Sequence, residues 1–301
     1  MSPAEESVLV EVDGRTLKIS NLAKVMYPRT GWTKGEVLHY YAQVSPVLLP
    51  QLTDRAVTRI RWPHGVEGSS FFEKNAPAGT PSWVRTEEVP TTGSRAPSRH
   101  GDTLRFPVVD DLATLTWLAN LAALELHVHQ WRVTAEGVQP PDRLVIDLDP
   151  GPPAGLHECC AVALEVRDEL AGRGLTSTPV TSGSKGLHLY ASLPPGTGAE
   201  ASTELAHEVA SVLEKRLPRQ VTATMTKTRR QGKVFLDWSQ NSGSKTTVAP
   251  YSLRGTDRPR VATPVTWDEV AAGAEDELGL DQFTPEQVLA RVAEHGDLFA
   301  L

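Results

Sequence analysis

The run from Arg143 to Pro150, with the sequence RLVIDLDP, limits the fold of this chain more than any other stretch. Its near-continuous apolar and β-branched residues predict a buried β-strand. Because side chains alternate between the two faces of a strand, we expect Asp147 and Asp149 to project from the same face. Two carboxylates placed so closely repel each other unless a cation lies between them. The pair predicts a divalent metal site, although a simple turn that begins at Asp149 explains the same residues equally well.

The order of the predicted elements indicates how this strand is placed in a sheet. It is followed by a helix, two strands, a second helix and a last strand, predicted at residues 157–171, 175–181, 187–192, 205–217 and 233–238. This β-α-β-β-α-β order is that of the ferredoxin-like or RRM-like unit, in which the first and last strands lie side by side in an antiparallel sheet. The last strand carries Asp237. The topology therefore predicts a site of three carboxylates for two cations.

Two Gly-Ser-Lys turns lie on the connections around this sheet, at residues 181–186 (TSGSKG) and 241–246 (NSGSKT). Small residues let backbone amides approach phosphate oxygens, which hydroxyl and ammonium groups also bind. Each turn taken alone is best interpreted as part of the surface, but their position beside carboxylates favours phosphate binding. Metals and phosphate together predict phosphoryl or nucleotidyl transfer. Further anion-binding side chains are close by in the sequence: Arg229, Arg230, Lys233 and Arg254.

The net charge of −7 is distributed unevenly along the chain. Residues 264–301 hold nine acids and one arginine, a local charge of −8, so the remaining residues carry +1. Residues 219–260 hold nine lysines and arginines and two aspartates, a local charge of +7. Such a concentrated positive field attracts polyanions whatever the total charge. The acidic end predicts two helices packed on the outside.

The sequence contains no long apolar run of the kind that crosses a bilayer, and its first residues are acidic and interrupted by charges. It therefore predicts neither a membrane span nor a signal peptide. We expect a cytoplasmic protein.

A helix start in the N-terminal half suggests an anion site. The spacing of Thr33-Lys34-Gly35-Glu36 is that of a capping box, which predicts a helix beginning at Lys34. Ser45-Pro46 predicts a second helix start, with a helix that continues to Leu52. Free amides and a lysine at a helix N-terminus attract anions, and Lys24 would join them. A solvated Lys34 is an equally good interpretation.

Strands and aromatic residues make up much of the remaining N-terminal sequence. Residues 7–20 predict a hairpin, and residues 56–62 (AVTRIRW) predict a strand with Arg61 on one face. Phe71 and Phe72 favour a core element, with stacking on nucleic acid bases as the alternative.

Residues 112–126 predict an apolar helix that leads into a strand, LHVHQW. His127 and His129 would share a face of that strand, where a hydrogen-bonded or solvated pair is more common than a metal site. Residues 76–105 predict an irregular connection with weak strands near residues 83–89.

Seven motifs resemble the polymerase domain of bacterial DNA ligase D, in the archaeo-eukaryotic primase superfamily, and the resemblance runs over about residues 17–298. They are RIRWPHGV, FFEK, ELHVHQW, VIDLDPG, VTSGSKGLHLY, TMTKTRRQGKVFLDWSQNSGSKTTVAPYSLRG and HGDLF. The resemblance implies an α/β (α+β type) primase-polymerase fold, with an RRM-like antiparallel catalytic sheet and an N-terminal α/β portion. We expect one domain over 1–301, with an N-terminal portion at about 1–140, a catalytic portion at about 141–255 and an acidic helical segment at about 264–301.

The resemblance also implies roles for individual residues. The metal ligands would be Asp147, Asp149 and Asp237, holding two ions, with Mn²⁺ preferred to Mg²⁺. The incoming nucleotide, commonly a ribonucleotide, would be held by Arg61, His127, Ser182, Lys185, Gln240 and Arg254. Arg230 would place the primer or activate the site, and Phe71 and Phe72 would meet the template. The 5′-phosphate of a gapped or recessed DNA end would bind Lys24 and Lys34.

One departure concerns Ile60, which stands where the family often has a basic residue before Arg61. The implied partners are gapped or broken DNA, NTPs or dNTPs, Ku and a DNA ligase, for a protein that is monomeric off DNA and located at the bacterial nucleoid. The role would be double-strand break end joining or gap repair. Two other functions fit the same residues: a non-catalytic module that bridges DNA ends, and a metal-dependent phosphoesterase or nuclease.

Overall fold

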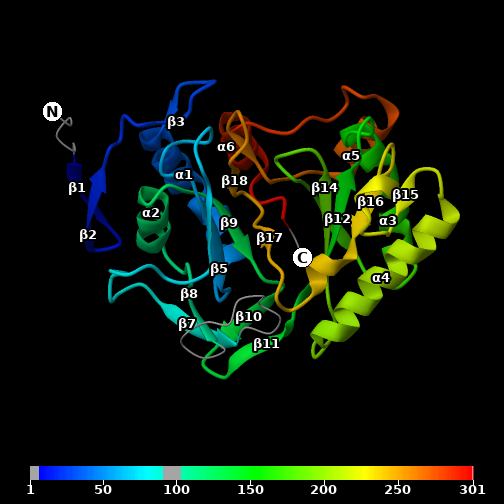
Figure 1. The fold of residues 1–301 in the computed structure, drawn as a ribbon, viewed down its shortest axis with the longest axis horizontal. Helices are drawn as coiled ribbons and strands as arrows, with labels where there is room; N and C mark the ends of the chain where they lie inside the picture. The colour runs from blue at the N-terminus through cyan, green and yellow to red at the C-terminus, as the bar shows by residue number, and fades with distance from the viewer. Residues whose placement is uncertain (1–6, 91–102, 300) are drawn as a thin grey trace.

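The computed structural model describes residues 7–90, 103–299 and 301. Figure 1 shows two sheets side by side, the N-terminal one with α1 and α2 and the C-terminal one with α3, α4 and α5. The N-terminal elements are β1 (Ser7–Val12), β2 (Arg15–Ser20), β3 (Val25–Tyr27), β4 (Trp32–Thr33), α1 (Lys34–Leu52), β5 (Val57–Arg61), β6 (Phe71–Glu73), β7 (Thr86–Pro90), β8 (Thr103–Pro107), α2 (Leu112–Asn120), β9 (Ala123–Val128), β10 (Trp131–Thr134) and β11 (Gly137–Pro141).

The predicted β-α-β-β-α-β unit is present in the second half of the chain. Its elements are β12 (Arg143–Pro150), α3 (Leu156–Ala171), β13 (Ser177–Thr181), β14 (Leu187–Ser192), α4 (Ala199–Arg216) and β16 (Val234–Asp237). The sheet order is β15-β16-β12-β14-β13-β20, with β15 (Val221–Thr222) and β20 (Thr263–Pro264) at the edges. β12 pairs antiparallel with both β14 and β16, so the expected contact between the first and last strands is confirmed.

The two faces of β12 have different surroundings. Leu144, Ile146 and Leu148 belong to a core cluster with residues of α3 and α4. Val145, on the opposite face, belongs to a second cluster that extends through α1 and β9 into the N-terminal half. Asp147 follows Val145 by two residues and therefore lies on the face turned away from α3 and α4. This alternation places the carboxylates between the two sheets.

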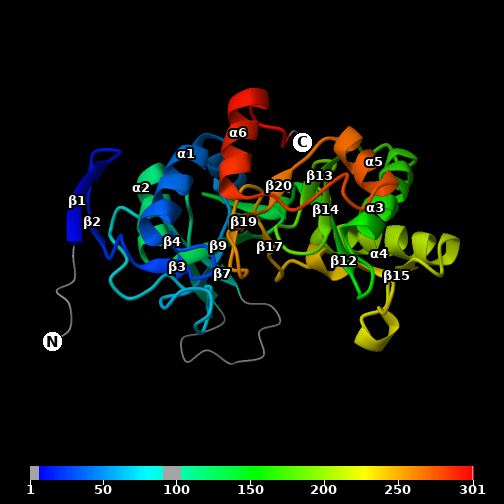
Figure 2. The ribbon, with the colours of Figure 1, turned by 90° about the horizontal axis from the view of Figure 1, so that it is seen from above.

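The remaining elements complete the N-terminal sheet and the C-terminal end. The N-terminal sheet has the order β17-β9-β5-β6, in which β17 (Thr247–Val248) comes from the second half of the chain. The acidic end forms the two helices expected, α5 (Trp267–Glu275) and α6 (Pro285–His295). Figure 2 shows α6 beside α1 and α5 beside α3, on the outer side of the molecule. Short 3₁₀ helices and strands make up the rest: η1 (Lys227–Arg229), η2 (Trp238–Asn241), β18 (Leu253–Arg254) and β19 (Arg260–Val261).

The structure confirms the capping box at Thr33 and corrects the second helix start. The Thr33 side chain accepts a bond from the Glu36 amide, and the Glu36 carboxylate accepts one from the Thr33 amide. α1 then runs unbroken to Leu52, with Pro46 inside it. Pro46 has no amide for the Ala42 carbonyl one turn earlier. The Ser45 hydroxyl donates to that carbonyl instead, at 2.8 Å, which lets the helix continue.

Two other boundaries differ from the sequence predictions. The helix predicted over residues 112–126 ends at Asn120, and Ala122 has a positive φ of 63° before β9 begins. β9 is a central strand between β5 and β17, so its residues are almost all buried and look like a continuation of an apolar helix. The hairpin at residues 7–20 is confirmed. The weak strand near residues 83–89 is β7, paired with β8, and the part of the irregular connection at 91–102 lies outside the described residues.

No helix in the described parts of the chain has the length and apolar character needed to cross a membrane.

His129 is a core residue whose ionisation opposes folding. Its ring stacks on Trp131 at 4.1 Å, and its Nδ1 lies 3.2 Å from the Ala56 carbonyl. Burial lowers the pKa of His129 to about 3, and the nearby charges of Lys74 and Arg55 act in the same direction. Because the unfolded chain binds this proton near the ordinary pKa of 6.5, the stability is complete above pH 6.5 and is lost as the pH falls toward 3.

We therefore expect this histidine to lower the free energy of unfolding by up to about 1.4 kcal/mol per pH unit below pH 6.5. Urea unfolding between pH 7 and pH 4.5, compared for the wild type and His129→Phe, measures the contribution of this group. The variant should show a shallower dependence on pH. Equal slopes in the two proteins would show that His129 is not the group responsible.

Candidate active site

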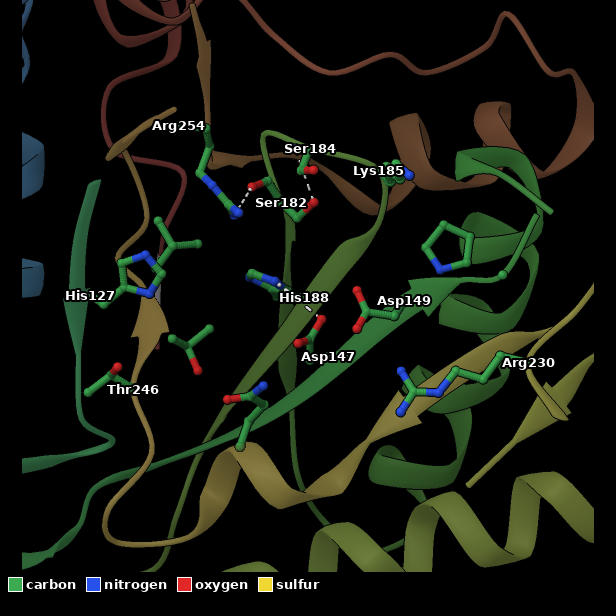
Figure 3. Close-up of a pocket in the computed structure, with 15 residues that line it drawn as sticks. His127, Asp147, Asp149, Ser182, Ser184, Lys185, His188, Arg230, Thr246 and Arg254 are labelled. Atoms are coloured by element: carbon green, nitrogen blue, oxygen red, sulfur yellow. Dashed lines mark hydrogen bonds and ion pairs between the residues drawn. The ribbon is translucent and has the colours of Figure 1, made fainter. Parts of the chain in front are cut away.

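A cavity of about 410 Å³ lies between the two sheets, in front of the carboxylates of β12. Figure 3 shows side chains from both halves of the chain around it, with His127 and Arg254 on one side and Asp149 and Arg230 on the other. Its lining residues are His127, Asp147, Asp149, Pro150, Gly151, Ser182, Ser184, Lys185, His188, Arg230, Gln240, Thr246, Thr247, Val248 and Arg254. Eight of the residues that the sequence singled out for a site are in this set.

Asp147 is at the centre of three adjacent strands. It pairs with Asp237 of β16 on one side and with His188 of β14 on the other. Its side chain is nearly buried, at 13% exposure, and His188 Nε2 lies 3.4 Å from its Oδ1. Burial, followed by the charge of Asp147, raises the pKa of Asp149 to about 6. The two carboxylates therefore repel each other across a partly desolvated space.

Asp237 lies opposite Asp147, but its carboxylate faces the start of η2. Its Oδ1 accepts bonds from the amide and the hydroxyl of Ser239, at 3.1 and 2.6 Å. Its Oδ2 accepts a bond from Gln240 Nε2 at 3.0 Å. Among the described residues, no three His, Cys, Asp or Glu side chains gather closely enough to hold a metal ion. The strand pairing predicted from topology is present, and its register places Asp237 opposite Asp147. The Asp237 carboxylate is directed away from the other two by its bonds to Ser239 and Gln240.

The donor set nevertheless fits a hard divalent cation. Asp147 and Asp149 supply carboxylate oxygens, the ligands that Mg²⁺ and Mn²⁺ prefer. A cation between them would relieve the repulsion that raises the pKa of Asp149. Asp237 would become a third oxygen donor only by giving up its bonds to Ser239 and Gln240.

The turn at residues 182–186 forms the wall of the cavity beside β13 and β14. The Ser182 hydroxyl oxygen accepts bonds from the amides of Ser184 and Gly186, at 3.2 and 3.1 Å, so its own hydrogen is free to donate elsewhere. Gly183 has a positive φ of 67°, and a Cβ there would lie 2.6 Å from Arg254 Cγ. The glycine is therefore required both by its backbone conformation and by the close approach of Arg254.

Arg254 and His127 are held by one buried carboxylate, Glu125. Glu125 Oε2 lies 2.7 Å from His127 Nε2, and Oε1 lies 3.2 Å from Arg254 Nε. The Gly255 amide donates to Oε1 at 2.9 Å. Burial alone would raise the pKa of Glu125, but these partners outweigh it and lower the pKa to about 2. Arg254 also donates to the Ser182 carbonyl at 2.8 Å, which joins this group to the turn.

Arg230 reaches the cavity from the loop that follows η1. Its guanidinium lies over the Phe235 ring at 3.6 Å from the centroid and donates to the Met225 carbonyl at 2.8 Å. The loop is bonded to the end of β12, because the Gly151 amide donates to Lys233 O at 2.8 Å. The Gly232 amide in turn donates to Gly151 O at 3.0 Å. Arg230 is thus positioned by the strand that carries the carboxylates.

Arg61 lies outside the cavity lining. It donates to Glu73 at 2.9 Å and to the Leu121 carbonyl at 2.6 Å, so the structure does not bring it together with the residues that line the cavity. Phe71 and Phe72, on β6, are 48% and 58% exposed. This exposure shows that their interpretation as core residues is wrong; β6 is an edge strand of its sheet.

The start of α1 has no free amides, contrary to the expectation for an anion site. The amides of Lys34 and Gly35 donate to the carbonyls of Lys24 and Leu22, at 2.8 and 2.9 Å, and that of Glu36 donates to the Thr33 hydroxyl. The Lys34 side chain is 5% exposed and donates to Ser20 O and Asn120 Oδ1, both at 2.7 Å. Lys24 is a neighbour of Lys34 because its carbonyl accepts the bond from the Lys34 amide, and Lys24 is half-buried.

Comparison with known proteins identifies the family to which this arrangement belongs. The family model described as LigD, primase-polymerase domain, matches residues 33–299. The chain belongs to the LigD primase-polymerase family. As a LigD primase-polymerase domain it is a nucleotidyltransferase, and it has the mixed α/β fold that the sequence predicted.

The relatives of this LigD domain are longer proteins. The multifunctional non-homologous end joining DNA repair protein LigD of Mycobacterium tuberculosis is 47% identical over 287 residues, which cover 93% of this chain and 36% of that protein. The bifunctional LigD of Bacillus subtilis is 33% identical, over 93% of this chain and 43% of its own length. The polymerase domain of M. tuberculosis Ligase D in complex with DNA superposes with a TM-score of 0.86 at 45% identity, covering 94% of this chain and 96% of that one.

Two residues of this LigD site were missed by the sequence analysis. His188 is paired with Asp147 on the neighbouring strand, so the register of the sheet was needed to find it. Glu125 precedes His127 by two residues on β9 and therefore shares its face. That alternation was present in the motif ELHVHQW and was a usable signal.

Proposed function

We propose that this LigD primase-polymerase domain is a template-directed nucleotidyltransferase that fills short gaps and extends DNA ends. The observation that supports this most is the cavity itself. It brings the carboxylates of β12 together with a hydroxyl-bearing turn and with the cations of Lys185, Arg230 and Arg254. Carboxylates for metals opposite groups for phosphates are the arrangement that an in-line attack of a primer 3′-hydroxyl on a nucleoside triphosphate requires.

Each wall of the cavity has its own task in this proposal. Ser182 and Lys185 bind the triphosphate oxygens, while His127 and Arg254, both oriented by Glu125, contact the sugar and phosphates. Gln240 lies beside Asp237 and contacts the nucleotide from the β16 side. Asp147, Asp149 and Asp237 would hold two divalent cations, Mn²⁺ or Mg²⁺, which when bound lower the pKa of the 3′-hydroxyl and neutralise the leaving pyrophosphate. Arg230 places the primer end.

DNA lies, in this proposal, along the N-terminal sheet. The exposed rings of Phe71 and Phe72 offer a surface for stacking on template bases. Lys24 and Lys34 receive the 5′-phosphate of the gap, with Lys34 already fixed by Ser20 and Asn120. The solved relative is a complex with DNA, and the longer relatives are named for non-homologous end joining. We therefore place this domain in end joining or gap repair, with Ku and a DNA ligase as partners.

Gap filling on a labelled primer with Mn²⁺ tests this function. A 5′-phosphate on the far side of the gap should increase kcat/KM by about tenfold over a 5′-hydroxyl, the effect of one charge-assisted contact. Ribonucleotides and deoxynucleotides are compared in parallel, and ribonucleotides should be preferred.

The same assay separates the other functions. DNA binding without synthesis at any metal would indicate an end-bridging module. Release of labelled nucleotides in the absence of added NTP would indicate a nuclease. A phosphate that makes no difference would show that Lys24 and Lys34 do not form the 5′-phosphate site.

A further inference from the structure

The side chain of Gln282, a residue of the acidic C-terminal segment, forms hydrogen bonds with the turn at residues 182–186. Gln282 Oε1 accepts a bond from the Gly183 amide at 2.7 Å, and Gln282 Nε2 donates to the Gly186 carbonyl at 3.0 Å. One side-chain amide thus joins both ends of the turn. Gln282 is 7% exposed, and both bonds are buried.

Hydrogen bonds to the backbone carbonyls of Gln282 and Phe283 fix the position of Gln282. Arg260 Nη1 donates to the Gln282 carbonyl, and the Val261 amide donates to the Phe283 carbonyl at 3.1 Å. These bonds tie the link between α5 and α6 to β19. Gly183 packs so closely on the same strand that a Cβ there would lie 2.7 Å from the Val261 carbonyl carbon. The turn is therefore clamped between β19 and Gln282.

The turn carries groups that face the cavity on its other side. Ser182 and Lys185 line the cavity, and the Ser182 carbonyl accepts a bond from Arg254. A shift of the turn would consequently move the hydroxyl, the ammonium and the guanidinium together. No other side-chain amide or carboxylate among the hydrogen bonds of the described residues contacts the Gly183 amide or the Gly186 carbonyl.

We propose that Gln282 is a positioning residue that sets the turn at residues 182–186 for binding of the nucleotide triphosphate. The inference rests on the proposed function, because it assigns the turn to the nucleotide. The acidic C-terminal segment thereby has a role in the site, although its negative charges are themselves unfavourable for binding phosphate. Removal of the amide leaves the buried Gly183 amide without a partner and leaves the Gly186 carbonyl with the Ser182 amide alone, at 3.0 Å. The turn can pair the Gly183 amide again only by moving.

Gln282→Ala should raise KM for the NTP about tenfold, the equivalent of two neutral hydrogen bonds, with a smaller change in kcat. The Kd for gapped DNA should stay at the wild-type value, because Phe71 and Phe72, proposed to meet the template, do not line the cavity with the turn. Gln287→Ala is the matched control. Its side-chain oxygen caps α6 by accepting from the Thr284 amide at 2.8 Å, so it loses a comparable bond in the same segment. It should leave KM unchanged.

Gln282→Glu keeps an acceptor for the Gly183 amide and loses the donor to Gly186, so its KM should be intermediate. Amide hydrogen exchange on the DNA-free protein gives a second readout. Exchange of residues 182–186 should become faster in Gln282→Ala and not in Gln287→Ala. A KM equal to that of the wild type, or an unchanged exchange rate in the turn, overturns the proposal. Absence of nucleotide incorporation by the wild type would instead overturn the proposed function, while exchange still reports on the clamp.

Discussion

Replacing Asp147 with asparagine is expected to reduce nucleotide incorporation by on the order of 10³-fold. Asp147 is the nearly buried carboxylate that pairs with Asp237 on one side and His188 on the other. The amide has the same shape, so β12 and its neighbours keep their register. The substitution removes the negative charge that a divalent cation needs and leaves Asp149 as the only charged ligand on β12. Single-turnover primer extension at saturating Mn²⁺ and NTP measures the effect on the chemical step.

Asp168→Asn is the matched control for this substitution. Asp168 lies in α3 of the same unit, and its side chain is 66% exposed. Its variant should retain wild-type rates, and both variants should bind gapped DNA with the wild-type Kd. Undiminished synthesis by Asp147→Asn would show that the Asp147 carboxylate is not needed for the reaction, and it would contradict the assignment of two metal ions to this site.

Gly151→Ala is expected to lower activity by about 10²-fold, through displacement of Arg230 rather than loss of a functional group. A Cβ at residue 151 would lie 1.9 Å from the Arg230 carbonyl oxygen and 2.6 Å from its carbonyl carbon. Both atoms are backbone, so the loop must move as a whole. The contact between Arg230 and the Phe235 ring would be lost with it. Overpacking of this kind also destabilises the fold by about 1–3 kcal/mol.

Gly198→Ala separates this effect from the general cost of replacing a glycine. Gly198 precedes α4, and a Cβ there meets nothing within 4 Å. Primer extension is measured well below the unfolding temperature of both variants, and circular dichroism reports the unfolding temperature itself. If Gly151→Ala is destabilised yet extends primers at the wild-type rate, the position of Arg230 does not matter for the reaction.

The general plan of the catalytic half was predictable because it follows from rules of chain topology. A β-α-β-β-α-β order allows few arrangements, and the pairing of β12 with β16 is one of their common features. The pairing of Asp147 with Asp237 depends in addition on the register, which a loop longer or shorter by one residue would change. Asp237 was therefore assigned to the right strand, while the bonds of its carboxylate to Ser239 and Gln240 had no signal in the sequence.

Errors in the N-terminal half have local physical causes. A proline after a serine is a common helix start, but the Ser45 hydroxyl satisfies the carbonyl that Pro46 leaves without a partner. The apolar run after Asn120 continues through a buried central strand, where helix and strand patterns look alike. Contacts such as that between Gln282 and Gly183 join residues 99 positions apart, so no local pattern indicates them.

The hydrophobic cluster that passes from α1 and β9 to Val145 and Tyr190 has a consequence for how the cavity responds to substrates. Buried hydroxyl bonds reinforce it, since Tyr40 donates to the Tyr251 carbonyl at 2.8 Å and Tyr190 to the Val248 carbonyl at 3.2 Å. The two sheets are not separate lobes joined by a hinge, because opening them would expose this shared core to water. We therefore expect nucleotide selection to occur without movement of one sheet against the other, so that discrimination between correct and incorrect nucleotides depends on backbone geometry present before binding.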